Sequence, residues 1–259
     1  MNEENLIKYY NKFNEDKRLN SRHGYIEFIT SLRYIKEYLD KMNNPKILDI
    51  GAGTGKYSIT LANEGYDVTA VELVKHNLKV IEKNSDKVKT YLGNAIKLDM
   101  FKDNSFDLIL LFGPMYHLVT KEEQLKALNE AKRILKPNGI LLVAYVMNEY
   151  AVIVHGFRDN YIIENIKENI IDDNFHCTPK ETDLYKYMRL EDINELNELS
   201  NLKRIKIITP DGPSNYIRNI LNKMDDETFN TYIKFHLSTC ERQDLIGAAA
   251  HTLDILKKE

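Results

Sequence analysis

The sequence predicts an α/β fold: a doubly wound, mostly parallel, seven-stranded sheet with helices on both faces, plus a mainly helical cap formed by two insertions. Short apolar runs alternate with stretches of helical periodicity in the first half of the chain, as in repeated strand–helix units. A glycine-rich turn joins the first strand to a helix. Residues 105–113 are almost wholly apolar after Asp107, which is typical of a strand covered on both faces. From residue 148 onward this rhythm breaks, which indicates insertions.

The elements follow in order from these patterns. Apolar residues recur along one face of residues 25–39, which predicts a helix before the sheet begins. The strand–helix alternation then predicts strands at 47–50, 67–72, 89–93, 105–113 and 140–146, and helices at 56–62, 75–84 and 121–135. Residues 135–139 (LKPNG) are a strong turn signal that should end the last of these helices.

The bulk composition indicates a globular protein without nucleic-acid or membrane character. The chain has 259 residues, 43% hydrophobic and 29% charged, with a net charge of -3. This charge gives no overall attraction to nucleic acid or to an anionic membrane. Cys177 and Cys240 lack metal-ligand spacing, and no apolar run could span a bilayer, so we expect no bound metal and a cytoplasmic location. The oligomeric state is not predicted.

The turn at 51–55 is the strongest functional signal. Asp49 stands near the end of an apolar strand, and Gly51, Gly53 and Gly55 follow at alternate positions. Glycines allow left-handed backbone angles and close approach of a ligand to the main chain. The spacing fits neither the dinucleotide fingerprint nor the phosphate loop. It resembles the first motif of the class I S-adenosylmethionine (SAM)-dependent methyltransferases, and we expect these four residues to bind that cofactor.

Further cofactor residues follow the next strands. Glu72 ends the strand at 67–72, where a carboxylate can accept both ribose hydroxyls. Many members of the family that the chain resembles have an acid where Asn94 stands, and its side-chain carbonyl can still accept from adenine. Leu73, Ala95 and Phe112 complete the cofactor-binding residues that we expect. The cofactor would be SAM, with S-adenosylhomocysteine as product.

Residues 113–118 (GPMYHL) end the strand at 105–113 and correspond to the family's fourth motif, beside the departing methyl group. The motifs used on exocyclic base amines and for cytosine C5 methylation are absent, since Pro114 is followed by Met115. Tyr116 and His117 are the candidate catalytic residues, able to orient or deprotonate a substrate. The alternative is that they only pack over the adenine.

The resemblance implies the organisation of the whole chain. We expect an N-terminal arm and helix over 1–40, a SAM-binding core over 41–148, a cap insertion over 149–182, a continuation of the sheet over 183–213, a helical cap insertion over 214–250 and a final strand over 251–259. The sheet continuation should contain a sixth strand at 203–209, with the final strand antiparallel beside it.

Substrate-binding candidates come from the arm and the insertions. Arg22 and Tyr25 precede or begin the first helix, and the family's arm often closes over the cofactor. His236 and Arg242 lie in the second insertion, and an arginine there could clamp a carboxylate or pair with a neighbouring acid. The further titratable candidates are His155, His176, Glu241 and His251.

Together these features predict a SAM-dependent methyltransferase. It would transfer a methyl group by in-line displacement to an oxygen or nitrogen nucleophile, with a small molecule as the favoured substrate. A protein or RNA substrate stays open, as does a SAM-binding module without turnover. Aminopropyl transfer by the same fold is a less favoured alternative, because the sequence shows no dedicated cluster of acidic residues that would bind a polyamine.

Overall fold

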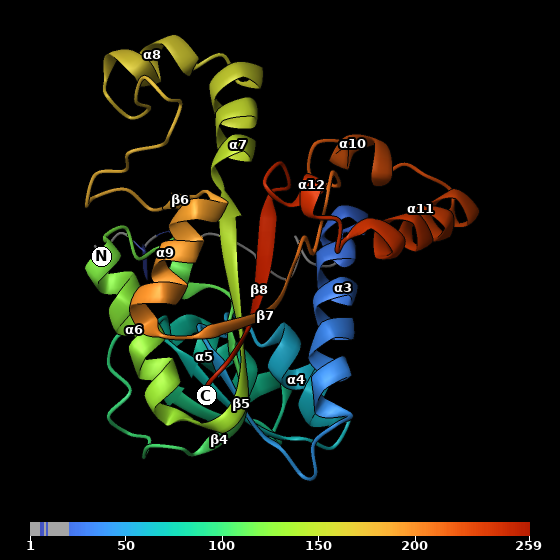
Figure 1. Cartoon of the computed structure of the whole chain (residues 1–259). Helices are drawn as coiled ribbons and strands as arrows, with labels where there is room; N and C mark the ends of the chain where they lie inside the picture. The colour runs from blue at the N-terminus through green and yellow to red at the C-terminus, as the bar shows by residue number, and fades with distance from the viewer. Residues whose placement is uncertain (1–5, 8, 10–20) are drawn as a thin grey trace.

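The computed structural model describes residues 6, 7, 9 and 21–259, and its strands form one sheet (Figure 1). Seven strands lie in the order β3-β2-β1-β4-β5-β8-β7, and an eighth, β6, pairs with β5 off this path. The strands are β1 (Lys46–Ile50), β2 (Asp67–Glu72), β3 (Lys89–Leu92), β4 (Phe106–Leu111), β5 (Leu135–Met147), β6 (Tyr187–Met188), β7 (Lys203–Ile208) and β8 (His251–Lys257). All pairings are parallel except those of β8, which is antiparallel to both β5 and β7.

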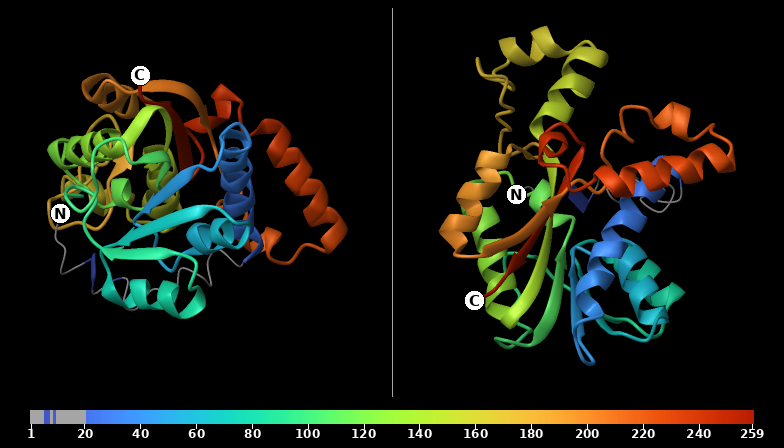
Figure 2. Two further views of the ribbon diagram at one scale, coloured as in Figure 1. Left: turned by 90° about the horizontal axis from the view of Figure 1, so that it is seen from below. Right: turned by 45° about the vertical axis from the view of Figure 1, so that its right-hand side comes forward.

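Helices cover both faces of the sheet (Figure 2). One face packs against α3 (Arg22–Leu39), α4 (Lys56–Asn63) and α5 (Lys75–Asn84), and the other against α6 (Lys121–Ile134) and α9 (Leu190–Ser200). Central strands such as β4 place alternate apolar residues in the two cores, so both of their faces are buried. The doubly wound fold predicted from the sequence is therefore confirmed.

The final strand is antiparallel beside the sixth long strand, as predicted, but it is inserted between that strand and β5. Residue pairs run from Ile140 with Lys257 to Val146 with His251 on the β5 side. The two-residue strand β6 was not predicted, because a stretch this short has no periodicity to detect. One consequence of the antiparallel direction is that β8 begins at the edge where the parallel strands end.

The turn predicted at 135–139 is built differently. Helix α6 ends at Ile134, and β5 begins at once with Leu135, which pairs with Phe106. The pairing then shifts register, and Asn138 takes a left-handed φ of 64°. The chain turns within an irregular start of the strand instead of in a separate loop.

The segments at 149–182 and 214–250 contain short helices that stand beyond the carboxyl edge of the parallel strands (Figure 1). The first holds most of α7 (Asn148–Ala151), a π-helical turn η2 (Val152–Arg158) and α8 (Ile162–Lys167), with a small core of its own. The second holds α10 (Arg218–Leu221), α11 (Asp226–Thr239) and α12 (Gln243–Ile246), and α10 and α11 pack on the start of α3. No helix within the described part of the chain is long and apolar enough to cross a membrane.

Candidate functional site

The glycine turn lies between β1 and α4, at the carboxyl edge of the sheet. Gly51, Gly53 and Gly55 all have left-handed φ values, of 74°, 56° and 87°. A Cβ atom on Gly51 would lie 2.5 Å from Cδ of Pro114, so this glycine allows η1 (Pro114–Tyr116) to approach. A Cβ on Gly53 would meet nothing within 4 Å. The turn thus leaves its main chain open at Gly53, beside a cavity. Residues at the carboxyl ends of β1, β2 and β4 all line this cavity.

Asp49 lies at the floor of this cavity, with only 2% of its surface exposed. The Ser58 hydroxyl, from α4, donates to its Oδ2 at 2.5 Å. Burial raises the pKa of Asp49 to about 6, although the Ser58 hydroxyl and backbone N–H act to lower it. The carboxylate is therefore fixed in direction by the helix that follows the glycine turn.

Glu72 lies at the end of β2 and is also buried. Its Oε2 accepts from the Gly53 N–H at 2.8 Å, and its Oε1 accepts from the Val74 N–H at 2.9 Å. Burial raises its pKa to about 7, against the lowering effect of these N–H groups. The Asn77 side chain is a third hydrogen-bond partner of this carboxylate. These three partners fix the plane of the carboxylate before any ligand binds.

The other predicted cofactor residues divide into two groups. Leu73, Ala95 and Phe112 line the same cavity as Asp49 and Glu72. Asn94 does not line it, because its side-chain oxygen accepts from the Ile96 N–H at 3.1 Å within its own turn. Its neighbours Gly93 and Ala95 border the cavity, and the expectation that the Asn94 side chain accepts from adenine stays a prediction.

Aromatic side chains that the sequence reading missed form one wall. Tyr57 of α4 lines the cavity between Phe28 of α3 and Phe112, with ring centroids 5.2 and 5.0 Å away. Leu6, from the described part of the N-terminal arm, also lines the cavity. The rest of the predicted arm lies almost wholly outside the described residues.

Tyr116 and His117 line the cavity as predicted. The Nδ1 atom of His117 donates to the Leu184 carbonyl at 2.6 Å, and the ring is buried. Burial lowers the pKa of His117 to about 4. A group with this pKa is a weak base at neutral pH, so the environment favours a wall residue over a proton acceptor.

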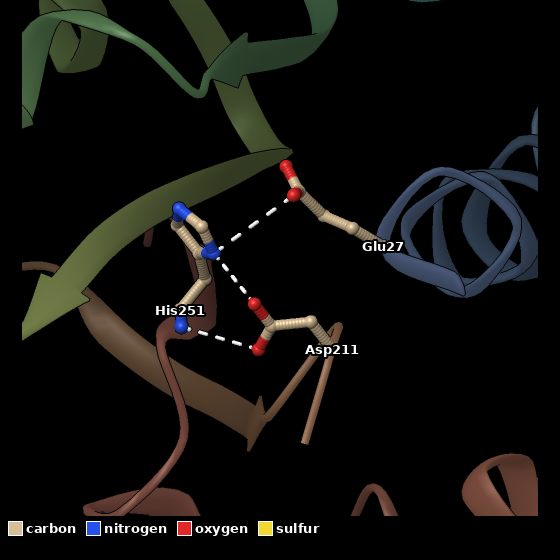
Figure 3. Close-up of side chains that lie close together, drawn as sticks. All are labelled: Glu27, Asp211 and His251. Atoms are coloured by element: carbon tan, nitrogen blue, oxygen red, sulfur yellow. Dashed lines mark hydrogen bonds and ion pairs between the residues drawn. The ribbon is translucent and has the colours of Figure 1, made fainter. Parts of the chain in front are cut away.

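A second polar cluster joins three distant segments (Figure 3). Glu27 comes from α3, Asp211 follows β7, and His251 begins β8. The Nδ1 atom of His251 lies 2.6 Å from Oδ2 of Asp211 and 3.8 Å from Oε2 of Glu27. Glu27 and His251 line the cavity that holds Asp49 and Glu72.

The three side chains bring possible metal-ligand atoms within 4.8 Å of one another. The expectation of no bound metal stays a prediction, because the structure shows only that these ligand-type atoms lie close together. Spacing along the chain does not reveal the cluster, since the residues are 40 to 224 positions apart in sequence. The available signals were an aspartate in the turn after a predicted strand and a histidine at the start of the antiparallel one.

The predicted substrate residues lie elsewhere. Arg22 pairs with Asp226 at 2.6 Å, and Tyr25 is 42% exposed. Arg242 pairs with Asp244 at 2.7 Å on the surface, which is the ion-pair alternative. None of these three, nor His236, lines the cavity.

His236 has a structural place behind the cluster. Its Nε2 atom donates to the Pro210 carbonyl at 3.1 Å, and a Cβ on Gly212 would lie 3.0 Å from its Nδ1. Burial lowers its pKa, which favours the neutral ring. His236 therefore supports the turn that carries Asp211. The other candidates, His155, His176 and Glu241, pair with Asp159, Asp192 and Lys206 away from the cavity.

The residues present fit the cofactor that the glycine turn indicates. A buried carboxylate at the end of β2 suits a ribose diol, and the open main chain at Gly53 suits close approach of a ligand. Leu73, Ala95 and Phe112 offer apolar contact for a base. A nicotinamide dinucleotide is less well matched, since the glycine spacing lacks the third position of its fingerprint.

Comparisons with known proteins agree with this geometry. Residues 48–143 match the model of a family described as a methyltransferase domain. The demethylmenaquinone methyltransferase of Paenarthrobacter aurescens is 35% identical over 112 residues, 43% of each chain. The ubiquinone biosynthesis O-methyltransferase of Rickettsia typhi is 27% identical over 164 residues, 61% of this chain and 64% of that one. The matches thus span less than two thirds of these curated relatives.

Solved structures extend the likeness to the whole chain. A SAM-dependent methyltransferase of Thermotoga maritima, described as a possible histamine N-methyltransferase, superposes with a TM-score of 0.60. It covers 98% of this chain and 99% of its own at 20% identity. At this identity the likeness establishes the fold alone, and this is the class I fold that the sequence predicted.

Proposed function

We propose that this chain, which has a methyltransferase domain at residues 48–143 and the class I methyltransferase fold, binds SAM and methylates an oxygen or nitrogen atom of a small molecule. The observation that carries the proposal is the buried carboxylate of Glu72. It is fixed by the N–H groups of Gly53 and Val74 and lines the cavity at the glycine turn. This is an acceptor for two vicinal hydroxyls, built before the ligand arrives.

The remaining residues have complementary roles in this proposal. Glu72 accepts from the ribose hydroxyls, and the turn at Gly51, Gly53 and Gly55 with Asp49 binds the rest of the polar chain. Leu73 and Ala95 flank the adenine, and Phe112 with Tyr57 closes the aromatic wall. When bound, the cofactor supplies a methyl group on a sulfonium, which leaves by in-line displacement and yields S-adenosylhomocysteine. The protein's contribution is then mainly proximity and alignment.

A small-molecule acceptor is supported by the form of the site. Tyr116, His117, Glu27 and His251 border the same cavity as the cofactor residues, so acceptor and cofactor would share one hollow. The net charge of -3 provides no overall attraction for RNA. The two curated relatives are named as a demethylmenaquinone methyltransferase and a ubiquinone biosynthesis O-methyltransferase, and both names refer to small molecules.

The first test is calorimetric titration with S-adenosylhomocysteine and, separately, with NAD. We expect micromolar binding of S-adenosylhomocysteine alone, weakened by Glu72→Gln and unchanged by Glu122→Gln, a matched change at an exposed position on α6. Binding of NAD alone, or of neither ligand, would refute the cofactor assignment.

Transfer itself is measured with methyl-labelled SAM against phenols, primary amines, tRNA and a cell protein extract. Label in the phenols or amines supports the proposal. Label only in tRNA or protein contradicts its substrate class, and tight binding of S-adenosylhomocysteine with no label in any acceptor favours a binding module.

A further inference from the structure

The proposed function gives the cluster of Glu27, Asp211 and His251 no part in binding the cofactor. Glu27 and His251 line the cavity, and His251 lies beside Tyr116. We propose that His251 takes the proton that the methyl acceptor loses, and that Asp211 holds the His251 ring in position for this step. This inference rests on the proposed function, and it assigns to His251 the role that the sequence suggested for His117.

Asp211 has the contacts of a positioning residue. It is fully buried, and its Oδ2 accepts from Nδ1 of His251 at 2.6 Å and from the side-chain amide of Asn215 at 2.6 Å. Its Oδ1 accepts from the His251 backbone N–H at 3.2 Å. The Asp211 carboxylate thus accepts hydrogen bonds from both the ring and the main chain of His251, and the two bonds together fix the orientation of the ring.

These contacts also distinguish a proton-transfer pair from a metal site. An ionised carboxylate can only accept, so the Nδ1 atom of His251 carries the proton in the bond to Asp211. A cation ligated by the same atoms would have to displace that proton and share Oδ2 with the Asn215 amide. The hydrogen bonds present therefore favour Asp211 as the partner of an imidazole.

The direction of the ring suits this role. Figure 3 shows Nε2 of His251 on the side turned away from both carboxylates. The Tyr116 ring lies 5.8 Å from the His251 ring, centroid to centroid. With Nδ1–H held by Asp211, the neutral ring has its basic electron pair on Nε2. Glu27, 3.8 Å from Nδ1, adds a second negative group that stabilises the imidazolium formed when Nε2 takes a proton.

The contrast with His117 supports the assignment. Both histidines border the cavity, but the Nδ1–H of His117 is held by the neutral Leu184 carbonyl, whereas that of His251 is held by a carboxylate. Burial lowers the pKa of His117 to about 4. A carbonyl stabilises a positive ring less than a carboxylate does. Of the two, His251 has the surroundings of a base.

The step balances with the residues named. An acceptor O–H or N–H loses its proton to Nε2 of His251, and the acceptor's electron pair forms the bond to the methyl carbon. The methyl–sulfur bond breaks with its pair on sulfur. The imidazolium later releases its proton to water. The class of acceptor is thus a neutral hydroxyl or an amine whose proton must leave during or before transfer.

The decisive measurement does not need the natural acceptor. The ¹⁵N chemical shifts of the His251 ring are followed from pH 5 to 9, with and without S-adenosylhomocysteine. The control is His76→Gln, which removes an exposed histidine and should leave the signals of His251 unchanged. We expect the neutral ring to carry its proton on Nδ1, the atom that donates to Asp211. Asp211→Asn should reduce the Nδ1–H form at least tenfold relative to the Nε2–H form.

Two results would overturn the proposal. The first is a neutral ring protonated on Nε2. The second is micromolar binding of Zn²⁺ or Mg²⁺ added alone, abolished by Glu27→Gln, which would make the cluster a metal site. Because the shifts are recorded without ligand as well, failure to bind S-adenosylhomocysteine would refute the proposed function separately.

For any phenol or amine that accepts the label, kinetics supply a second readout. His251→Asn keeps a side-chain N–H for Asp211 but removes the base. We expect kcat to fall about 100-fold or more with KM changed less than threefold, as for loss of a general base. The affinity for S-adenosylhomocysteine should stay the same. Full turnover in His251→Asn would refute the role of the ring.

Discussion

The coupling of cofactor binding to the ionisation of Glu72 is the sharpest prediction of this structure. Burial raises the pKa of Glu72 to about 7, and two backbone N–H groups point at its oxygens. Ribose hydroxyls would donate to the ionised form and stabilise it, so binding should lower this pKa and release a proton. Affinity for S-adenosylhomocysteine should therefore rise with pH.

The magnitude follows from the ionised fraction. With a pKa of about 7, Glu72 is ionised in roughly a tenth of the molecules at pH 6 and in roughly nine tenths at pH 8. If the ionised form binds, the apparent Kd falls about tenfold between these pH values. Asp49, with a pKa of about 6, adds a shallower dependence at lower pH.

The assay is calorimetric titration at pH 6, 7 and 8 in buffers of different ionisation enthalpy, which reports the protons released. Glu72→Gln should remove the tenfold change and weaken binding at pH 8 by roughly 10- to 150-fold, the loss of a charge-assisted hydrogen bond of about 1.5–3 kcal/mol. A wild-type Kd that is flat from pH 6 to 8, or a slope that survives in Glu72→Gln, would refute the reasoning.

The same pKa has a consequence for the unliganded protein. The folded-state pKa of Glu72 is raised above 4.5, the usual value for a glutamate. Its contribution to the free energy of unfolding is therefore complete below pH 4.5 and is lost as pH rises through about 7. The loss is about 3 kcal/mol, since each pKa unit corresponds to about 1.4 kcal/mol. In urea unfolding, the stability of Glu72→Gln relative to wild type should rise by about this amount between pH 4.5 and 8.

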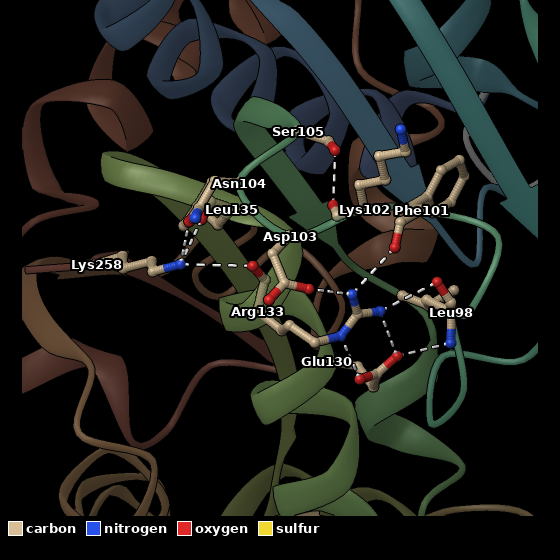
Figure 4. Close-up of polar contacts among 10 residues, drawn as sticks. All are labelled: Leu98, Phe101, Lys102, Asp103, Asn104, Ser105, Glu130, Arg133, Leu135 and Lys258. Carbon is tan, nitrogen blue, oxygen red and sulfur yellow. Dashed lines mark hydrogen bonds and ion pairs between the residues drawn. The ribbon is translucent and has the colours of Figure 1, made fainter.

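Three further outcomes are expected. Gly51→Ala forces a left-handed φ of 74° and places Cβ 2.5 Å from Pro114, so urea unfolding should show a loss of about 1–3 kcal/mol, while Gly247→Ala, whose Cβ meets nothing within 4 Å, should not. The lowered pKa of His117 means that its contribution to the free energy of unfolding is complete above pH 6.5 and is lost as pH falls through about 4. His117→Asn should therefore lose less stability than wild type between pH 6.5 and 4, and an equal loss in the two proteins would contradict this. Arg133→Lys should lower the midpoint of thermal unfolding, because the guanidinium donates to two carbonyls and two carboxylates that an ammonium cannot serve together (Figure 4); an unchanged midpoint would contradict it.

The cofactor half could be predicted from sequence because its signals are local. The turn from Gly51 to Gly55 and the acid at Glu72 each follow a recognisable strand, and parallel strands bring their carboxyl ends to one edge. Tyr57 was missed in the same region, since an aromatic residue in a helix has no periodicity that separates a cavity wall from core. Asn94 was in the right turn, but its side chain bonds to its own loop.

The substrate side was harder because a charged residue's role depends on its partner in space. Arg22 and Arg242 were proposed as clamps, yet both are paired with carboxylates away from the cavity. Sequence neighbours hinted at this only for Arg242, whose partner Asp244 is two positions away. For Arg22 the partner is Asp226, 204 positions distant, and only the packing of α11 on α3 brings the two together.

The direction of β8 explains why the polar cluster escaped notice. A search for site residues after the ends of strands is correct for parallel strands, and it leads to Asp49, Glu72 and the turn with Asp211. In an antiparallel strand the first residue, not the last, lies at that edge. His251 begins β8 opposite Val146 near the end of β5, and so it faces the same cavity. In a parallel sheet closed by one antiparallel strand, the start of that strand should be searched together with the ends of the others.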